Sequence, residues 1–145
     1  MESEIYKRLK TNCKSTRIIR VENRIEIATP DMYYTNKESN GWIEAKEMDI
    51  MHSTVIPWHN GYAQYEWLRK NFLYGGLSIL CIIDNGKLRK NGLFFVVNGY
   101  IAETLQCACY VRNKDLENFL RSPISEEWIP SPIEEFRKEY SFIWN

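Results

Sequence analysis

Two strand-like stretches separated by a polar turn constrain the fold of this chain most strongly. The segment RIEIATPDMYYTNKESNGWIEAKEMDI, residues 24–50, has apolar-rich residues on both sides of NKESNG. Such stretches favour strands, and the residues between them are typical of a turn. The segment therefore predicts an antiparallel hairpin. Its first strand carries Pro30-Asp31, and its second carries Glu44-Ala45-Lys46.

The register of this hairpin decides which side chains meet. With the turn centred between residues 38 and 39, Asp31 lies opposite Lys46, and Glu44 lies opposite Tyr33. Facing residues of an antiparallel pair point to the same side, and side chains alternate along each strand. Asp31, Glu44 and Lys46 then share one face, with a diagonal Asp31–Glu44 Cα separation of roughly 7–8 Å. A slip of one residue would put Asp31 on the opposite face from Glu44.

Two carboxylates and a lysine on one face have a definite chemical use. The carboxylates can hold a divalent cation, and a lysine beside them can orient water or offset developing negative charge. The arrangement favours a site that hydrolyses phosphodiesters. The alternative is an exposed hairpin whose charges are only solvated.

Four segments in this order carry a family resemblance: ATPDMYY, GWIEAKEM, GYAQYEWLRKNF and LSILCII. The chain resembles the PD-(D/E)xK nuclease superfamily, and within it the VRR-type and Holliday-junction-resolvase-like nucleases of phages and repair systems. The resemblance covers roughly residues 17–84. One departure is Ala28-Thr29, which stands before Pro-Asp where family members often have a glycine-led turn.

The resemblance implies a fold and an activity. The expected fold is an α/β (α+β) restriction-endonuclease-like core, a mixed sheet with flanking helices in the order α-β-β-β-α-β. A β meander and C-terminal helices follow it within one domain, residues 1–145, in which residues 85–145 form a C-terminal extension. The expected activity is that of a metal-dependent endonuclease acting on DNA, with branched or structured DNA among the candidate substrates. Mg²⁺ is the expected cofactor, with Mn²⁺ as a substitute.

The resemblance also assigns roles to individual residues. Asp31, Glu44 and the backbone carbonyl of Ala45 would bind the metal, while Lys46 would act on the attacking water and Gln64 would assist the site. Nucleases of this type usually add a third acidic residue from an early element. The candidates for it, in order of preference, are Glu22, Glu4 and Glu26.

Composition predicts a soluble protein of one domain. The 145 residues suffice for one domain with a core, and 44% hydrophobic with 14% aromatic residues exclude disorder. No apolar run approaches the ~20 residues that span a bilayer, and the N-terminus lacks a signal-peptide core. We expect a cytoplasmic protein without membrane contact, located in the host cytoplasm if it is viral.

Charge is distributed unevenly although its sum is zero. Residues 1–24 carry seven basic and three acidic groups, while residues 122–145 carry five acidic and two basic groups. A basic face near the N-terminus could therefore meet DNA phosphates. An ordinary mixed surface is an equal alternative.

The four cysteines show no zinc-site spacing, so we expect reduced, packed thiols. The two histidines, His52 and His59, follow the Glu-x-Lys strand and are either surface residues or groups that reach the cleft.

Patterns elsewhere predict the remaining elements. Helices are expected at Glu2 to Asn12 and at Gly61 to Tyr74, and a doubly buried strand is expected at LSILCII. Asn60 is expected to cap the second helix and Gly75-Gly76 to end it, with Gln64 at the head of its apolar stripe. The remaining expectations are three turns at Asn85-Gly86, Asn91-Gly92 and Asn98-Gly99, a helix capped by Asn113, and a last helix with a Ser131/Glu134 capping box and Pro132 at its first position.

The last helix carries an apolar stripe that either packs on the body or forms a dimer contact. A homodimer is therefore one expectation. Two functional alternatives also stay open. One is a catalytically idle nuclease-fold protein that binds nucleic acid or a protein partner, and the other is a small α+β interaction protein.

Overall fold

The fold is built around a mixed β-sheet in a computed structural model that describes residues 2–21, 28–59 and 61–141. Within these residues a seven-stranded sheet has its strands in chain order. Only the β3–β4 pair of this sheet is parallel, and every other neighbouring pair is antiparallel. The strands are β1 (Arg17–Arg20), β2 (Met32–Thr35), β3 (Asn40–Met48), β4 (Ser78–Asp84), β5 (Gly92–Val97), β6 (Cys107–Arg112) and β7 (Ser131–Pro132).

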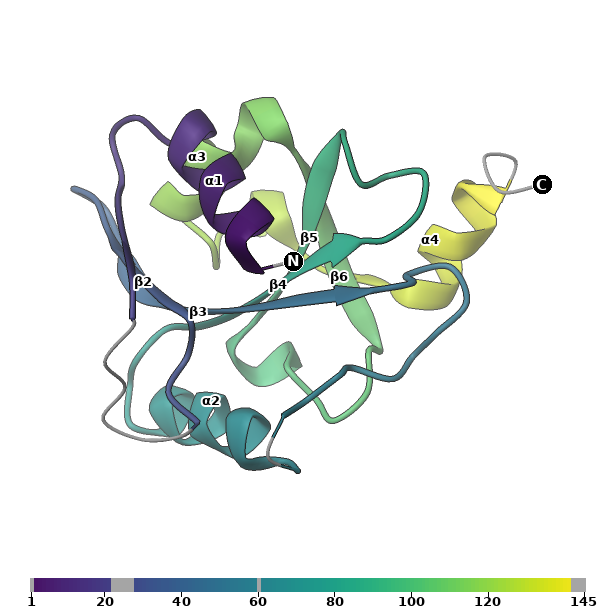
Figure 1. The fold of residues 1–145 in the computed structure, drawn as a ribbon, viewed down its shortest axis with the longest axis horizontal. Helices are drawn as coiled ribbons and strands as arrows, with labels where there is room; N and C mark the ends of the chain where they lie inside the picture. The colour runs from purple at the N-terminus through teal and green to yellow at the C-terminus, as the bar shows by residue number, and fades with distance from the viewer. Residues whose placement is uncertain (1, 22–27, 60, 142–145) are drawn as a thin grey trace.

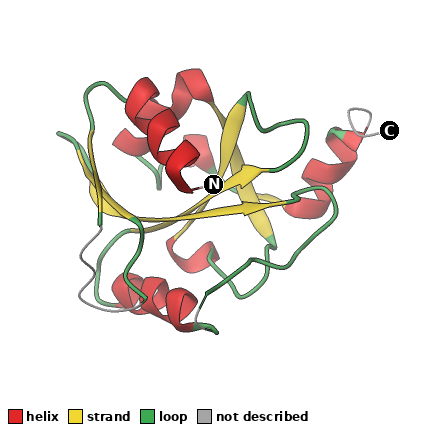
Figure 2. Cartoon of the chain, in the orientation of Figure 1, coloured by secondary structure: helices red, strands yellow, loops and turns green. Residues whose placement is uncertain are grey.

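Helices cover both faces of this sheet. Helix α2 (Ala63–Leu73) lies on one face, whereas α1 (Glu2–Asn12) and α3 (Leu116–Arg121) lie on the other (Figure 1). Helix α2 connects β3 to β4, and such a crossover is what a parallel pair of strands requires. A fourth helix, α4 (Ile133–Glu139), follows β7 (Figure 2). The element order α-β-β-β-α-β and the layers confirm the predicted fold class of a mixed sheet with flanking helices. Among the described residues no helix has the length and apolarity needed to cross a bilayer.

Strand β3 presents different chemistry on its two faces. Ile43 and Ala45 pack into the core under α1 and α3, together with Ile5 and Leu9 of α1. Because side chains alternate along a strand, Glu44 and the other even-numbered residues point to the α2 face. The α2 face has its own apolar cluster, which includes Leu68, Leu80 and Ile82. Glu44 and Lys46 therefore lie under α2, at the edge of this second cluster.

The predicted hairpin forms, but its register differs from the prediction by two residues. Tyr33 pairs with Trp42, not with Glu44, and Met32 pairs with Ile43. The cause is the turn: the Asn36 N–H donates to the Ser39 carbonyl, and the Asn36 side-chain oxygen accepts from the Glu38 and Ser39 N–H groups. This side-chain-to-backbone turn places the turn centre one residue earlier, between residues 37 and 38, so each cross-strand partner changes by two. A shift of two keeps every side chain on its predicted face because the strand period is two.

Helix α2 and strand β4 follow the sequence pattern closely. All seven residues of β4 are buried, as predicted for the continuous apolar run. Helix α2 begins at Ala63 rather than at Gly61, and its N-cap residue, Tyr62, makes no side-chain capping bond. The proposed cap, Asn60, lies outside the described residues. Gly75 ends the helix with a φ of 95°, a conformation that favours glycine.

The predicted meander of β5 and β6 is confirmed, but its turns are fewer than expected. Asn85-Gly86 and Asn91-Gly92 both belong to the single connection between β4 and β5, and Gly92 is already the first residue of β5. Asn98-Gly99 lies in a one-turn 3-10 helix, η1 (Asn98–Tyr100), where Asn98 has a positive φ of 45°. An Asn-Gly pair thus marks a bend without fixing a hairpin.

Two predicted helix caps are wrong because their side chains or backbones are used elsewhere. The Asn113 side chain makes no cap and donates to the Lys90 carbonyl, and a one-turn helix, η2 (Asn113–Asp115), precedes α3. Ser131 pairs with Ala108 of β6 in place of forming a capping box, and α4 begins after Pro132. Helix α4 packs on the body, as predicted, and its apolar residues Ile133 and Phe136 are buried.

Candidate active site

Asp31 lies immediately before β2 and faces the middle of β3. Pairing between β2 and β3 ends at Met32 and Ile43, so Ala45 has no partner on β2 in this ladder. The Asp31 Oδ2 atom accepts the Ala45 N–H at 3.0 Å, and the Asp31 carbonyl accepts from the Val21 N–H. The carboxylate therefore extends the ladder beyond the end of the strand, which fixes its position beside Glu44.

Glu44 and Lys46 lie two residues apart on β3 and point to the α2 face. The distance from Lys46 Nζ to Glu44 Oε2 is 3.2 Å. Asp31, Glu44 and Lys46 are all buried, with exposed fractions of 7%, 1% and 4%. Two carboxylates and an ammonium group thus lie close together where solvent access is low.

Gln64 of α2 holds the Lys46 side chain by a hydrogen bond. It lies in the first turn of α2, is buried, and its Oε1 atom accepts from Lys46 Nζ at 2.7 Å and from the His59 N–H at 2.8 Å. Strand β3 and the loop before α2 therefore both donate to the same amide oxygen of the helix. Trp58 of that loop places its ring 5.8 Å from Lys46 Nζ, within the range of a cation–π contact.

The oxygen atoms present fit a hard divalent cation. Asp31 and Glu44 supply carboxylates, which are ligands that Mg²⁺ and Mn²⁺ prefer. The N–H and carbonyl of one strand residue point toward the same neighbouring strand. Since the Ala45 N–H points to Asp31, the Ala45 carbonyl is directed to the same side. In the part of the chain that the structure describes, no group of three or more Asp, Glu, His or Cys side chains forms a ready metal cluster.

The structure describes only one of the three candidates for a third acidic residue. Glu22 and Glu26 lie outside the described residues. Glu4 is on α1, where it pairs with Arg8 and Arg89. Arg89 also pairs with Glu47, whose side chain is on the opposite face of β3 from Glu44. Glu4 therefore lies across the sheet from the candidate site, and its expected role as a substitute ligand is wrong.

The two histidines do not add side chains to this constellation. His52 is exposed, and its ring bonds to the carboxylate of Asp49 at 2.9 Å. His59 is exposed and contributes its backbone N–H to Gln64. Trp58 and the His59 backbone are contributors that the sequence reasoning missed. Their segment, Pro57 to His59, is irregular, so no periodic pattern could have placed it against the site.

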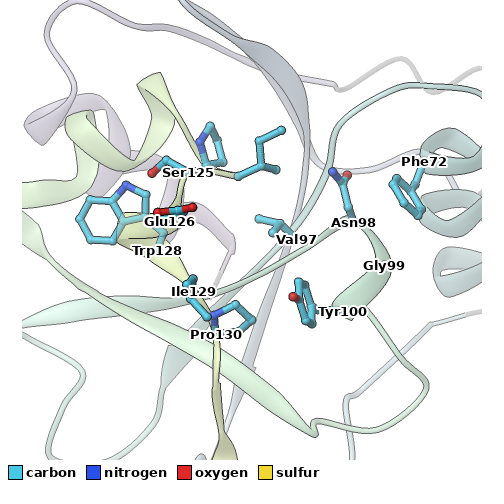
Figure 3. Close-up of a pocket in the computed structure, with 12 residues that line it drawn as sticks. Phe72, Val97, Asn98, Gly99, Tyr100, Ser125, Glu126, Trp128, Ile129 and Pro130 are labelled. Carbon is cyan, nitrogen blue, oxygen red and sulfur yellow. The ribbon is translucent and has the colours of Figure 1, made fainter.

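Two other features of the described residues lie apart from the site. Asp84, at the end of β4, is fully buried, but its oxygens accept from the Ile50 and Leu88 N–H groups and hold the connections after β3 and β4. An apolar hollow of about 560 Å³ is lined by side chains that include Tyr100 and Ile129 (Figure 3). None of the predicted site residues lines this hollow.

Comparison with known proteins adds one structural likeness. No protein-family model matches the chain, and no curated protein does. Among solved structures, the chain is similar to Hjc, a Holliday junction resolvase from the archaeal hyperthermophile Archaeoglobus fulgidus. The two are 18% identical with a TM-score of 0.45, and the likeness covers 65% of this chain and 70% of that one.

Proposed function

We propose that this protein is a metal-dependent nuclease that hydrolyses phosphodiester bonds in DNA. The observation that carries the proposal is the convergence of Asp31, Glu44 and Lys46 on one buried face, with Lys46 fixed by Gln64. A solvated hairpin would have exposed charges and would not need a buried amide to hold its lysine. These four side chains come from the segments that resemble PD-(D/E)xK nucleases.

Each residue has a proposed task in hydrolysis. Asp31, Glu44 and the Ala45 carbonyl would hold Mg²⁺. When bound, this ion would supply Lewis-acid stabilisation of the charge that develops on the phosphate. The N–H of Ala45 holds Asp31 in place so that its carboxylate need not reorganise during the reaction.

Lys46 supplies a positioned positive charge. An ammonium group has three N–H donors. One donates to Gln64, and the group also forms an ion pair with Glu44. The proposed role of a further donor is to orient the attacking water or to bond a phosphate oxygen. Burial strengthens this contribution, because an ion pair is worth more where water is excluded.

A cleavage panel tests the proposal. Plasmid DNA and labelled oligonucleotides in duplex, single-stranded, flapped and branched forms would be incubated with Mg²⁺ or Mn²⁺. We expect Asp31→Asn, Glu44→Gln and Lys46→Met each to lower the cleavage rate at least 100-fold, on the order of one lost transition-state contact. Glu47→Gln is the matched control, since Glu47 is the neighbouring acid on the opposite face.

The outcomes separate the functional alternatives. Full metal-dependent cleavage by purified Asp31→Asn protein would refute the assignment. DNA binding without cleavage by the wild type under every condition would favour the idle nuclease-fold alternative.

A further inference from the structure

Aromatic side chains flank the proposed catalytic residues on the same face of the sheet. Trp42 precedes Glu44 by two residues on β3, and Tyr33 follows Asp31 by two residues, so both share their face. The Tyr33 and Trp42 ring centroids are 5.0 Å apart, and those of Trp42 and Trp67 are 5.3 Å apart. This group, Tyr33–Trp42–Trp67, is only partly buried.

A second aromatic pair lies at the lysine. The Trp58 ring is 5.8 Å from Lys46 Nζ and 5.9 Å from the Tyr65 ring. Its indole N–H donates to the Glu103 carbonyl at 3.0 Å, which fixes the orientation of the ring. Trp58 is also partly exposed. The proposed site thus has ordered, accessible rings beside both its carboxylates and its lysine.

Several described arginines are engaged away from the proposed site. Arg8 bonds to the Arg89 and Gly92 carbonyls, and Arg89 pairs with Glu4 and Glu47, so both arginines are engaged across the sheet. The Arg20 guanidinium lies over the Tyr6 ring of α1, also on the far face. Arg17 shares the site face, since it is aligned with Thr35, but it lies on the edge strand.

We propose that the site takes an unpaired DNA strand, whose bases stack on Trp42 and Trp58. This inference rests on the proposed nuclease function and names its substrate class. Stacking on aromatic rings is the main contact that single strands make with proteins, because every base has an exposed π-face. Bases inside a duplex already stack on one another and cannot reach such rings without being extruded. A phosphate between two stacked bases would then lie over Glu44 and Lys46.

Binding by a cleavage-deficient protein tests the inference. In an Asp31→Asn background, the affinities for a labelled single strand and for the duplex of the same sequence would be measured by fluorescence anisotropy over a range of salt concentrations. We expect the single strand to bind more tightly. Trp58→Leu and Trp42→Leu should each lower its affinity by about tenfold, on the order of one lost base stack.

The controls separate stacking from general damage. Trp58→Phe keeps an aromatic ring and should stay within about threefold of the parent affinity. Tyr100→Leu removes an aromatic residue that is 54% exposed but lines the separate apolar hollow, and it should change nothing. The slope of log affinity against log salt concentration should be the same in Trp58→Leu and in its parent, because a stacking ring releases no counterions. A circular dichroism spectrum and melting curve would show that each variant is folded.

The failures of the two proposals are distinguishable. Tighter binding of the duplex, or unchanged single-strand affinity in Trp58→Leu and Trp42→Leu, would overturn the inference. Wild-type protein that cleaves duplex but not single-stranded or flapped DNA would overturn it also, while leaving the nuclease proposal intact. Wild-type protein that cleaves nothing but shows the expected stacking losses would refute the nuclease proposal alone.

Discussion

Lys46 of β3 and Gln64 of α2 are joined by a hydrogen bond of 2.7 Å, so a helix and a strand together define where the buried ammonium group lies. The same Gln64 oxygen accepts from the His59 backbone, which ties the loop before α2 to the lysine. Glu44 forms an ion pair with the same group, with Oε2 at 3.2 Å from Lys46 Nζ. Loss of the amide should therefore disturb the lysine before it disturbs the fold.

We predict that Gln64→Leu lowers the rate of DNA cleavage by about 10- to 100-fold, the usual effect of removing a group that orients a catalytic side chain. Gln64→Glu retains an acceptor for both Lys46 and His59 and should recover part of the rate. Single-turnover kinetics with each variant would measure this. A leucine variant that cleaves at the wild-type rate would show that Gln64 is structural only.

Metal binding should be visible without any substrate. A ligand that binds only the folded state at 100 times its dissociation constant stabilises that state by about 2.7 kcal/mol. We expect Mg²⁺ or Mn²⁺ to raise the melting temperature of the wild type and of Glu47→Gln. The same ions should have little effect on Asp31→Asn or Glu44→Gln, because each lacks one carboxylate ligand. Calorimetric melting curves with and without EDTA would decide, and equal metal shifts in all four proteins would contradict the assigned ligands.

Asn36 should be the most sensitive residue of the hairpin turn. Its side chain accepts from the Glu38 and Ser39 N–H groups and donates to Thr16 Oγ1 and to the Leu120 carbonyl. At roughly 0.5–1.5 kcal/mol for each net hydrogen bond, Asn36→Ala should lower the free energy of unfolding by about 2–6 kcal/mol. Urea denaturation would measure the loss. Asn40→Ala, which removes one exposed bond to the Tyr33 hydroxyl, is the matched control and should cost less than about 1 kcal/mol.

Stability should fall in alkali because of a buried thiol. Burial, with a smaller effect of the nearby Glu117 carboxylate, raises the pKa of Cys13 from its ordinary 9.0 to about 12. Above pH 9 the unfolded chain loses this proton while the folded protein keeps it. The stabilisation is therefore fully present below pH 9 and is lost as the pH rises toward 12.

Replacing this thiol should weaken the pH dependence. Cys13→Ala should reduce the slope of unfolding free energy against pH by up to about 1.4 kcal/mol per pH unit in this range. Denaturant titrations at pH 8 and pH 10 would measure this slope. The control is Cys107→Ala, because Cys107 is more exposed than Cys13. A slope unchanged by Cys13→Ala would show that the thiol does not titrate as its burial requires.

Much of the fold could be predicted because local patterns and long-range packing agree there. The apolar run of β4 is buried on both faces, and α1 begins and ends where its pattern predicts. The predicted helix caps are wrong because each of these residues can satisfy its polar groups in two ways. Asn113 and Ser131 are both good caps in isolation, but Asn113 bonds to Lys90 and Ser131 joins the ladder of β6.

The sequence by itself determined the hairpin and the face on which Asp31, Glu44 and Lys46 lie, because a period of two is a local property of strands and survives a register shift of two. Only the tertiary structure decided the rest of the candidate site. The crossover of α2 brings Gln64 onto Lys46, the irregular loop delivers Trp58, and the sheet separates Glu4 from Glu44. These relations depend on how elements distant in the chain pack together, which no local period encodes.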